Sequence, residues 1–170
     1  MLVKKVRKFR ADRDHNLCEK ANDTCSVQGH WKFTLTHEDG TSEIFEYDNI
    51  CPTVGRSLIA THLTSGSPTP ALLINYVGLG TNVAVPANAD TQLGTETYRN
   101  ATASYTSANN IAYITGFFNA TECNGTYKEA GMFSGATGVA NSGVLISHVA
   151  INITKTITDT LTIDWTLTIS

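Results

Sequence analysis

The histidines of this chain are its best candidates for acid–base chemistry, but no nucleophile stands beside them in a catalytic arrangement. The Gly-x-Ser-x-Gly turn that exposes a catalytic serine is absent, and Ser147-His148 is an ordinary pair of neighbours. Gly78-Leu-Gly80 lacks the third glycine and the helix of a dinucleotide-binding site, so it indicates only the exit of a strand. The sequence therefore predicts a protein that is not an enzyme, with no catalytic residues and no cofactor.

Cysteine and histidine side chains near the start of the chain are the ligands that zinc prefers. The candidates are His15, Cys18, Cys25, His30 and Cys51. The gap between Cys18 and Cys25 is wider than that of the usual zinc-binding turn, so the sequence predicts no metal site. Because no secretory signal is apparent, the four cysteines, Cys123 included, are expected to be free thiols. A local Cys18–Cys25 bridge, formed after release to an oxidising medium, remains open.

Four charged residues, Asp90, Glu96, Arg99 and Glu129, stand in a part of the chain where charge is sparse. We expect Arg99 to pair with Glu96 or Glu129 and to pin the long polar loop 81–91 to a sheet. A ligand or metal site made of Asp90 and Glu96 is the alternative. Two acids six residues apart are commonplace, so the structural ion pair is the preferred interpretation.

Aromatic side chains near loops could recognise a carbohydrate on a host surface. Core packing accounts for most of the tyrosines and phenylalanines between 105 and 127. The sequence nevertheless leaves open a receptor-binding tip, in which rings near strand ends act together with two Asn-containing loops. Its members would be Asn109, Asn110, Tyr113, Asn124 and Tyr127.

Charge is distributed unevenly along the chain. Residues 1–14 carry a net charge of +4, whereas the other 156 residues carry −7, which gives the overall −3. The bases of this arm are Lys4, Lys5, Arg7, Lys8, Arg10 and Arg13. Such an arm can bind an acidic protein, an anionic membrane or nucleic acid. The acidic body itself supplies the first of these, so protein contact is the preferred interpretation and head-to-tail contact between copies is a plausible use. An ordinary solvated chain end is the alternative. Nucleic acid is not expected, because no interleaved basic and aromatic residues follow the arm.

Length and composition indicate one folded domain. A chain of 170 residues can bury a sizeable core, and 41% of its residues are apolar while only 16% are charged. Thr, Asn, Gly, Ala and Ser fill the difference, which suits strands and turns with a weakly charged surface. No stretch approaches the length of a membrane span, so no membrane partner is expected.

The elements that must hold these side chains are mostly strands. Residues 161–169 alternate apolar and polar side chains without exception, and residues 31–37 do the same through Trp31, Phe33 and Leu35. Asp39-Gly40 then predicts a tight turn before a returning strand at 43–47.

Pro52 and the spacing of the apolar residues after it predict a single helix at 54–64. Further strands are expected from the remaining apolar runs and turn residues, with a small-residue loop at 135–143. Their ranges are 71–77, 98–106, 111–120, 128–133, 144–153 and 160–170.

About eight strands with closely spaced turns predict a mainly β protein. We expect an antiparallel β-sandwich, of jelly-roll or immunoglobulin-like type, with one short α-helix and an extended basic N-terminal arm. The arm and the Cys-containing loop would occupy residues 1–30, and a single sandwich domain would occupy 31–170.

From about residue 43 onward, the order of several short motifs resembles that of the small structural proteins of tailed bacteriophages, described as tail-fibre-like or virion-associated. The motifs begin with Gly55-Arg56, continue through 74–81 and Pro86 to Arg99, and end with Glu129–Phe133 and Leu161–Trp165. They cover about three quarters of the chain. The first 30 residues depart from the pattern, so the resemblance says nothing about the role of the arm.

The resemblance implies a virion component made in the host cytoplasm: a tail, fibre or baseplate subunit, or a capsid decoration protein. Its partners would be other virion proteins and copies of itself, a trimer being favoured, since closed oligomers cover exposed sheet edges. Two rival functions stay open. One is a carbohydrate- or receptor-binding module, and the other is a subunit of an extracellular filament.

Overall fold

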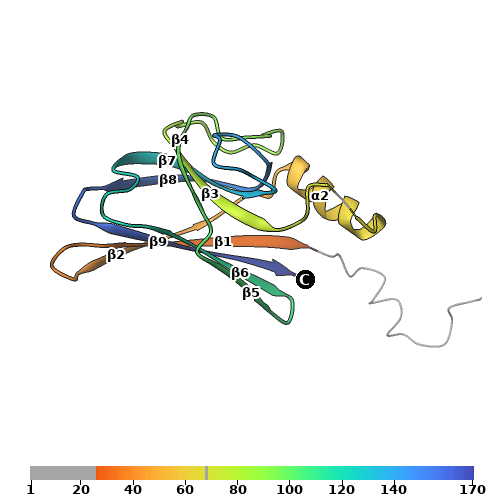
Figure 1. Ribbon diagram of the computed structural model, residues 1–170, viewed down its shortest axis with the longest axis horizontal. Helices are drawn as coiled ribbons and strands as arrows, with labels where there is room; N and C mark the ends of the chain where they lie inside the picture. Colours follow the sequence, from red (N-terminus) through yellow and green to blue (C-terminus); the bar gives the residue numbers. More distant parts are fainter. Residues whose placement is uncertain (1–25, 68) are drawn as a thin grey trace, which may run out of the picture.

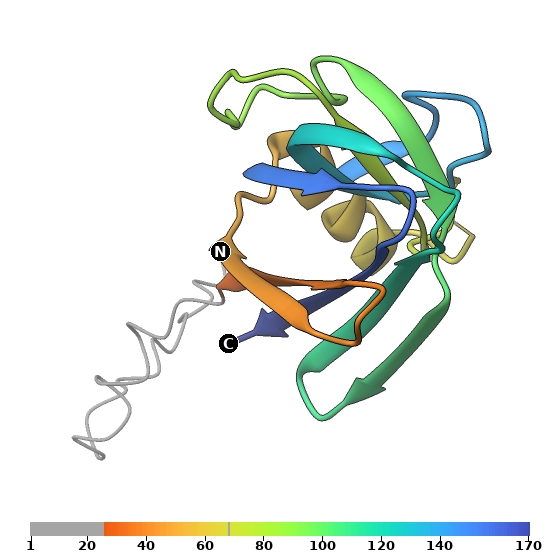
Figure 2. The same cartoon turned by 90° about the vertical axis from the view of Figure 1, so that its left-hand side faces the viewer.

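A computed structural model describes residues 26–67 and 69–170 and shows two antiparallel sheets packed face to face, with one helix at one end (Figure 1). The first sheet has the order β2(Ser42–Asp48), β1(Val27–Thr36), β9(Thr160–Ile169), β6(Ile111–Phe118), β5(Ser104–Ala108). The second has the order β4(Glu96–Ala101), β3(Ile74–Gly80), β7(Gly125–Ser134), β8(Val144–Lys155). The predicted mainly β sandwich with one short helix is confirmed, and Figure 2 shows its two layers.

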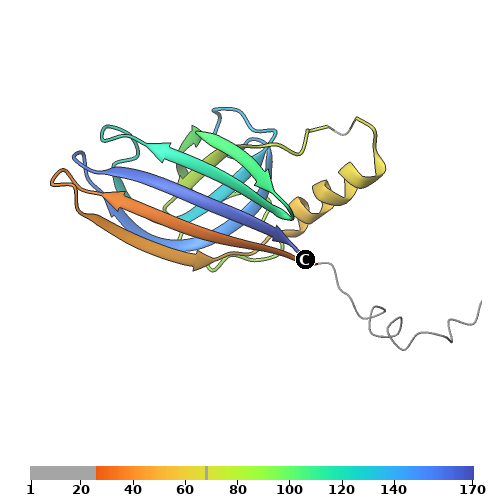
Figure 3. The same ribbon diagram turned by 90° about the horizontal axis from the view of Figure 1, so that it is seen from below.

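The first sheet is built on the alternating strands that the sequence predicts. β1 and β9 lie side by side at its centre (Figure 3), and Trp31 is paired with Trp165 while Phe33 is paired with Ile163. These four side chains are at most 1% exposed. Burial of each large apolar side chain contributes roughly 1.5–3 kcal/mol, so this register is strongly specified.

The second sheet is covered on both faces, which is why β7 is buried almost continuously. Its inner face packs on the first sheet through residues such as Met132. Its outer face carries a second, smaller core of buried residues, to which one residue of the 81–95 loop contributes. The members are Leu93, Phe133, Ala136 and Leu145. The long loops are therefore packed onto the sheet, and they complete it.

The helix α2(Thr53–Thr64) begins after Pro52 and packs on β8. Gly55 allows this approach, because a Cβ atom there would lie 2.9 Å from the Cα atom of Ile146. Within the described ranges, no helix has both the length and the apolar character needed to cross a membrane.

Several boundaries differ from those expected from the sequence. The strand predicted at 71–77 is β3, Ile74–Gly80, so Gly78 and Gly80 belong to the strand and do not follow it, and the strand predicted at 128–133 is the longer β7. The single strand predicted at 98–106 is two strands, β4 and β5, which belong to different sheets. At the crossing point Thr102 donates its backbone N–H to Asn75 of β3, and Ala103 donates to Thr115 of β6. β1 also begins at Val27, so the sandwich starts before the predicted boundary at residue 31.

Candidate functional site

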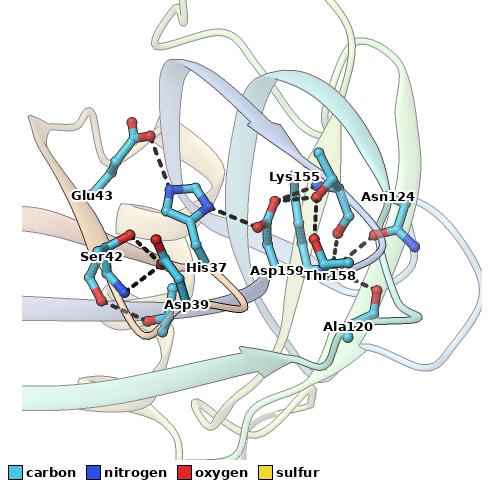
Figure 4. Close-up of polar contacts among 12 residues, drawn as sticks. His37, Asp39, Ser42, Glu43, Ala120, Asn124, Lys155, Thr158 and Asp159 are labelled. Carbon is cyan, nitrogen blue, oxygen red and sulfur yellow. Dashed lines mark hydrogen bonds and ion pairs between the residues drawn. The ribbon is translucent and has the colours of Figure 1, made fainter.

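Three connections meet at one end of the sandwich: the β1–β2 hairpin tip, the β6–β7 loop and the β8–β9 turn (Figure 4). The antiparallel register brings them together, since Leu161 at the start of β9 is paired with both Leu35 near the end of β1 and Phe118 at the end of β6. The polar side chains of these connections form a hydrogen-bonded network that includes His37, Lys155 and Asp159.

His37 joins two of the three connections. Its Nδ1 lies 2.8 Å from Oδ1 of Asp159, and its Nε2 lies 3.1 Å from Oε1 of Glu43. Both ring nitrogens therefore face carboxylates, an arrangement that favours the doubly protonated imidazolium. The hydrogen bond to Asp159, followed by that to Glu43, raises the pKa of His37 above its usual 6.5.

Asp159 anchors this network through hydrogen bonds within the β8–β9 turn. Its Oδ2 accepts hydrogen bonds from the hydroxyl and the backbone N–H of Thr156, both at 2.7 Å. The hydroxyl bond lowers the pKa of Asp159 most, burial opposes it, and the backbone bond and His37 bring the pKa to about 2. Asp159 is thus a carboxylate at all physiological pH values, and it is 3% exposed.

Lys155 holds the third connection. Its ammonium group is buried and donates to the carbonyl oxygens of Ala120 and Thr156 and to Oδ1 of Asn124, at 2.9–3.2 Å. Three donors meet three acceptors, so the group is fully hydrogen-bonded. Asn124 is therefore engaged in fixing the β6–β7 loop to the β8–β9 turn.

A groove of about 540 Å³ opens between the β1–β2 hairpin and the β8–β9 turn. Its apolar lining comes from Leu35 and Phe45, and its polar lining comes from His37, threonines and carboxylates. Within the described part of the chain, all exposed acidic residues belong to the β1–β2 hairpin, and the others are half-buried or buried. These residues are Glu38, Asp39, Glu43, Glu46 and Asp48. We call the groove together with the three of these residues that line it, Glu38, Asp39 and Glu43, the acidic groove.

The ion pair predicted from sequence involves Arg99 and Glu96, with Nη2 at 2.7 Å from Oε2. The guanidinium group also lies 4.6 Å from the ring centre of Phe133 and donates to the carbonyl of Thr137 and the hydroxyl of Ser142, both at 2.9 Å. Arg99 therefore fixes the 135–143 loop, whereas the sequence-based expectation was loop 81–91.

Glu129 carries out the role that the sequence assigned to Arg99. Its carboxylate accepts the backbone N–H groups of Thr95 at 2.7 Å, Gly94 at 2.9 Å and Asn82 at 3.3 Å. Burial raises the pKa of Glu129, but hydrogen bonds from His148 and these N–H groups outweigh it, so the net pKa is lowered. This carboxylate fastens the 81–95 loop to β7.

His148 was missed by sequence reasoning as a member of this cluster. It is buried between two carboxylates, with Nδ1 at 2.8 Å from Oδ2 of Asp90 and Nε2 at 3.1 Å from Oε2 of Glu129. Its place on β8, directly after Ser147, gave no local signal, because the contact is made across the sheet. Asp90 thus pairs with His148 and not with Glu96.

The receptor-binding tip considered from sequence is not assembled. The Asn109-Asn110 turn and Asn124 lie at opposite ends of β6, whose eight residues span about 25 Å. Tyr127 is 5% exposed and packs in the core, where burial raises its pKa to about 12. Tyr113, which is 39% exposed, keeps an accessible ring.

The remaining sequence candidates are placed as follows. The bases of the arm, Lys4 to Arg13, lie outside the described residues, as do Cys18 and Cys25. Cys51 and Cys123 are free thiols, and burial raises the pKa of Cys123 to about 12, so this thiol is unreactive. Residues 26–67 and 69–170 contain no group of three or more His, Cys, Asp or Glu side chains arranged to hold a metal ion.

No protein-family model, curated protein or solved structure matches the chain in searches of each kind.

Proposed function

We infer that this chain is a structural subunit of a tailed-phage virion, a tail, fibre or baseplate component or a capsid decoration protein, and that it acts by protein–protein assembly. The observation that carries assembly is the separation of charge. The exposed carboxylates gather on the β1–β2 hairpin, while the basic residues 1–14 precede Ser26, which lies at the other end of β1. The assignment to a virion rests on the motif resemblance.

The interior supports a scaffold role. The buried charged groups of Arg99, Glu129 and Lys155 each engage several partners, and those partners are mostly loop backbone. Such fully bonded groups hold loops in place. A rigid body with fixed loops suits a lattice subunit, and its edge strands β2, β5, β4 and β8 leave hydrogen-bonding groups that a closed oligomer, a trimer by the resemblance, would cover.

Immunoblotting of virus particles purified from the organism that carries the gene tests the virion assignment. We expect the chain to co-purify with particles through a density gradient, together with capsid and tail proteins. Detection of the chain only in the soluble fraction, with particles free of it, would contradict the proposed function.

A second candidate is recognition of a host-surface glycan. Tyr113 and Phe117 are 39% and 43% exposed, and their positions four residues apart on β6 put both rings on the outer face of the first sheet. Exposed rings on a flat surface stack on sugar faces. A glycan array with the full-length protein tests this idea. Binding should be lost in the Tyr113→Ala and Phe117→Ala variants while the oligomeric state stays unchanged.

A further inference from the structure

The two ends of the sandwich carry opposite features. β1 begins at Val27, beside the chain end at Ser170, whose hydroxyl lies 2.7 Å from that of Ser26, and it runs ten residues to the hairpin that bears the acidic groove (Figure 3). At the rise of an extended strand, this is a separation of about 31 Å. The basic arm therefore precedes one end of the body, and the acidic groove lies at the other.

We propose that the acidic groove binds residues 1–14 of a second copy of this chain, so that copies join head to tail. This inference rests on the proposed assembly function and names the surface that receives the arm. It predicts a contact between two different surfaces, the arm of one copy and the groove of the next.

The chemistry of the two surfaces is complementary. The arm carries a net charge of +4, with Leu2, Val3, Val6 and Phe9 among its bases. The groove offers Leu35 and Phe45 as apolar lining. Carboxylates at the groove rim can meet lysine and arginine side chains while the apolar residues of the arm lose contact with water.

Reach favours a second copy over the arm's own groove. Only residues 15–25 connect the arm to Ser26, and eleven residues span about 40 Å when fully extended. To return to its own groove, the arm would need this linker extended to roughly three quarters of its full length along the 31 Å body. Binding to a neighbour needs no such stretching, so it preserves more chain entropy. A contact between unlike surfaces then produces a ring or an open filament, depending on the rotation between copies.

Sedimentation velocity of full-length variants tests the inference. The groove variant is Glu38→Lys with Glu43→Lys. Its matched control is Glu46→Lys with Asp48→Lys, which makes the same charge change on the opposite face of β2, because Phe45 faces the core and alternate residues face away. We expect self-association to weaken at least tenfold in the groove variant and less than threefold in the control. Glu38→Lys alone leaves both His37 bonds intact and should weaken it by an intermediate factor.

A mixing experiment identifies the polarity of the contact. The arm variant Lys4→Gln, Lys5→Gln, Arg7→Gln loses three positive charges without gaining negative ones, so it cannot bind the basic groove of the groove variant. It keeps a normal groove, and the groove variant keeps a normal arm. We expect each to be monomeric alone and the two together to form a one-to-one dimer that grows no further. Circular dichroism spectra matching that of the original protein establish that both variants are folded.

Different results would overturn the arm–groove contact and the virion function. Normal self-association of the folded groove variant, a mixture that stays monomeric, or an original protein that is monomeric at low salt would each overturn the acidic groove as the receiver of the arm. None of these results would remove the chain from virus particles, and its absence from particles would overturn the virion function alone.

Discussion

Replacement of Glu129 by glutamine removes the charge that fastens the 81–95 loop to the second sheet. Glu129 is 1% exposed, and its carboxylate accepts hydrogen bonds from three backbone N–H groups and from Nε2 of His148. A glutamine amide of the same shape keeps one oxygen. In one orientation of the amide, the NH₂ group would face the backbone N–H of Gly94. In the other it would face the N–H groups of Asn82 and Thr95. Either way, at least one buried N–H would lose its acceptor.

The expected loss follows from these bonds. A hydrogen bond to a charged group contributes about 1.5–3 kcal/mol, and a buried donor left without a partner costs about 1–3 kcal/mol. We therefore expect Glu129→Gln to lower the free energy of unfolding by about 3–5 kcal/mol, a large part of the total for a domain of this size.

Urea denaturation followed by circular dichroism measures this loss, and amide hydrogen exchange locates it. The amides of Gly94 and Thr95 should exchange much faster in Glu129→Gln, while those of β1 and β9 change only with global stability. Glu122→Gln is the matched control, since Glu122 is half-buried and accepts one backbone N–H, that of Asn119 at 2.9 Å; it should cost less than about 1 kcal/mol. A Glu129→Gln variant within 1 kcal/mol of the original, with unchanged exchange at Gly94 and Thr95, would refute the reasoning.

Three further outcomes are expected. The pKa of His37 is raised in the folded state, so protonation of His37 stabilises the fold fully below the unfolded-state pKa near 6.5, and this stabilisation is lost as pH rises through the folded-state pKa. The urea midpoint should therefore fall as pH is raised from below 6.5 to above the folded-state pKa. His37→Asn should make the midpoint depend less on pH. Arg99→Lys loses the bidentate contact with Glu96 and should lower the free energy of unfolding by about 2–3 kcal/mol. The 135–143 loop should then be cleaved faster in limited proteolysis. Gly55→Ala forces a Cβ atom against the backbone of Ile146 and should lower the thermal midpoint, at a cost of about 1–3 kcal/mol.

The central pair of strands could be predicted from the sequence because its information is local. Strict alternation over 161–169 and around Trp31 fixes which side chains face inward, and Asp39-Gly40 fixes the turn. In the structure Gly40 has φ of +82°, a conformation that glycine adopts without strain. Pattern, turn chemistry and burial all agree here, so one register results.

The division between β4 and β5 could not be predicted in this way. Residues 98–106 look like one polar strand, and nothing in their order marks Thr102 as the point where the chain leaves one sheet for the other. The crossing is specified by partners far away in sequence, Asn75 and Thr115, which pair with consecutive residues from different sheets. Information of this kind lies in the tertiary contacts.

The polar clusters show the same limit. Arg99 and Glu96 are three residues apart, so their pairing was accessible from sequence, whereas Glu129 and His148 meet only because β7 and β8 are neighbours. Tyr127 was considered a receptor residue because it follows an Asn-Gly turn. It is buried because its position on β7 faces the first sheet. Exposure of a ring depends on which sheet face it occupies, and a short sequence window does not contain that information.

Separation of charge gives the molecule a direction. A typical surface mixes both signs, which discourages ordered self-contact. Here the buried cations of Arg99 and Lys155 are occupied with loop backbone, while the exposed carboxylates gather on one hairpin. The excess of base in residues 1–14 therefore has its strongest complement at the far end of the body. In the proposed head-to-tail assembly, each subunit would therefore add in one orientation, since head-to-head contact would bring the carboxylates of one hairpin against those of another.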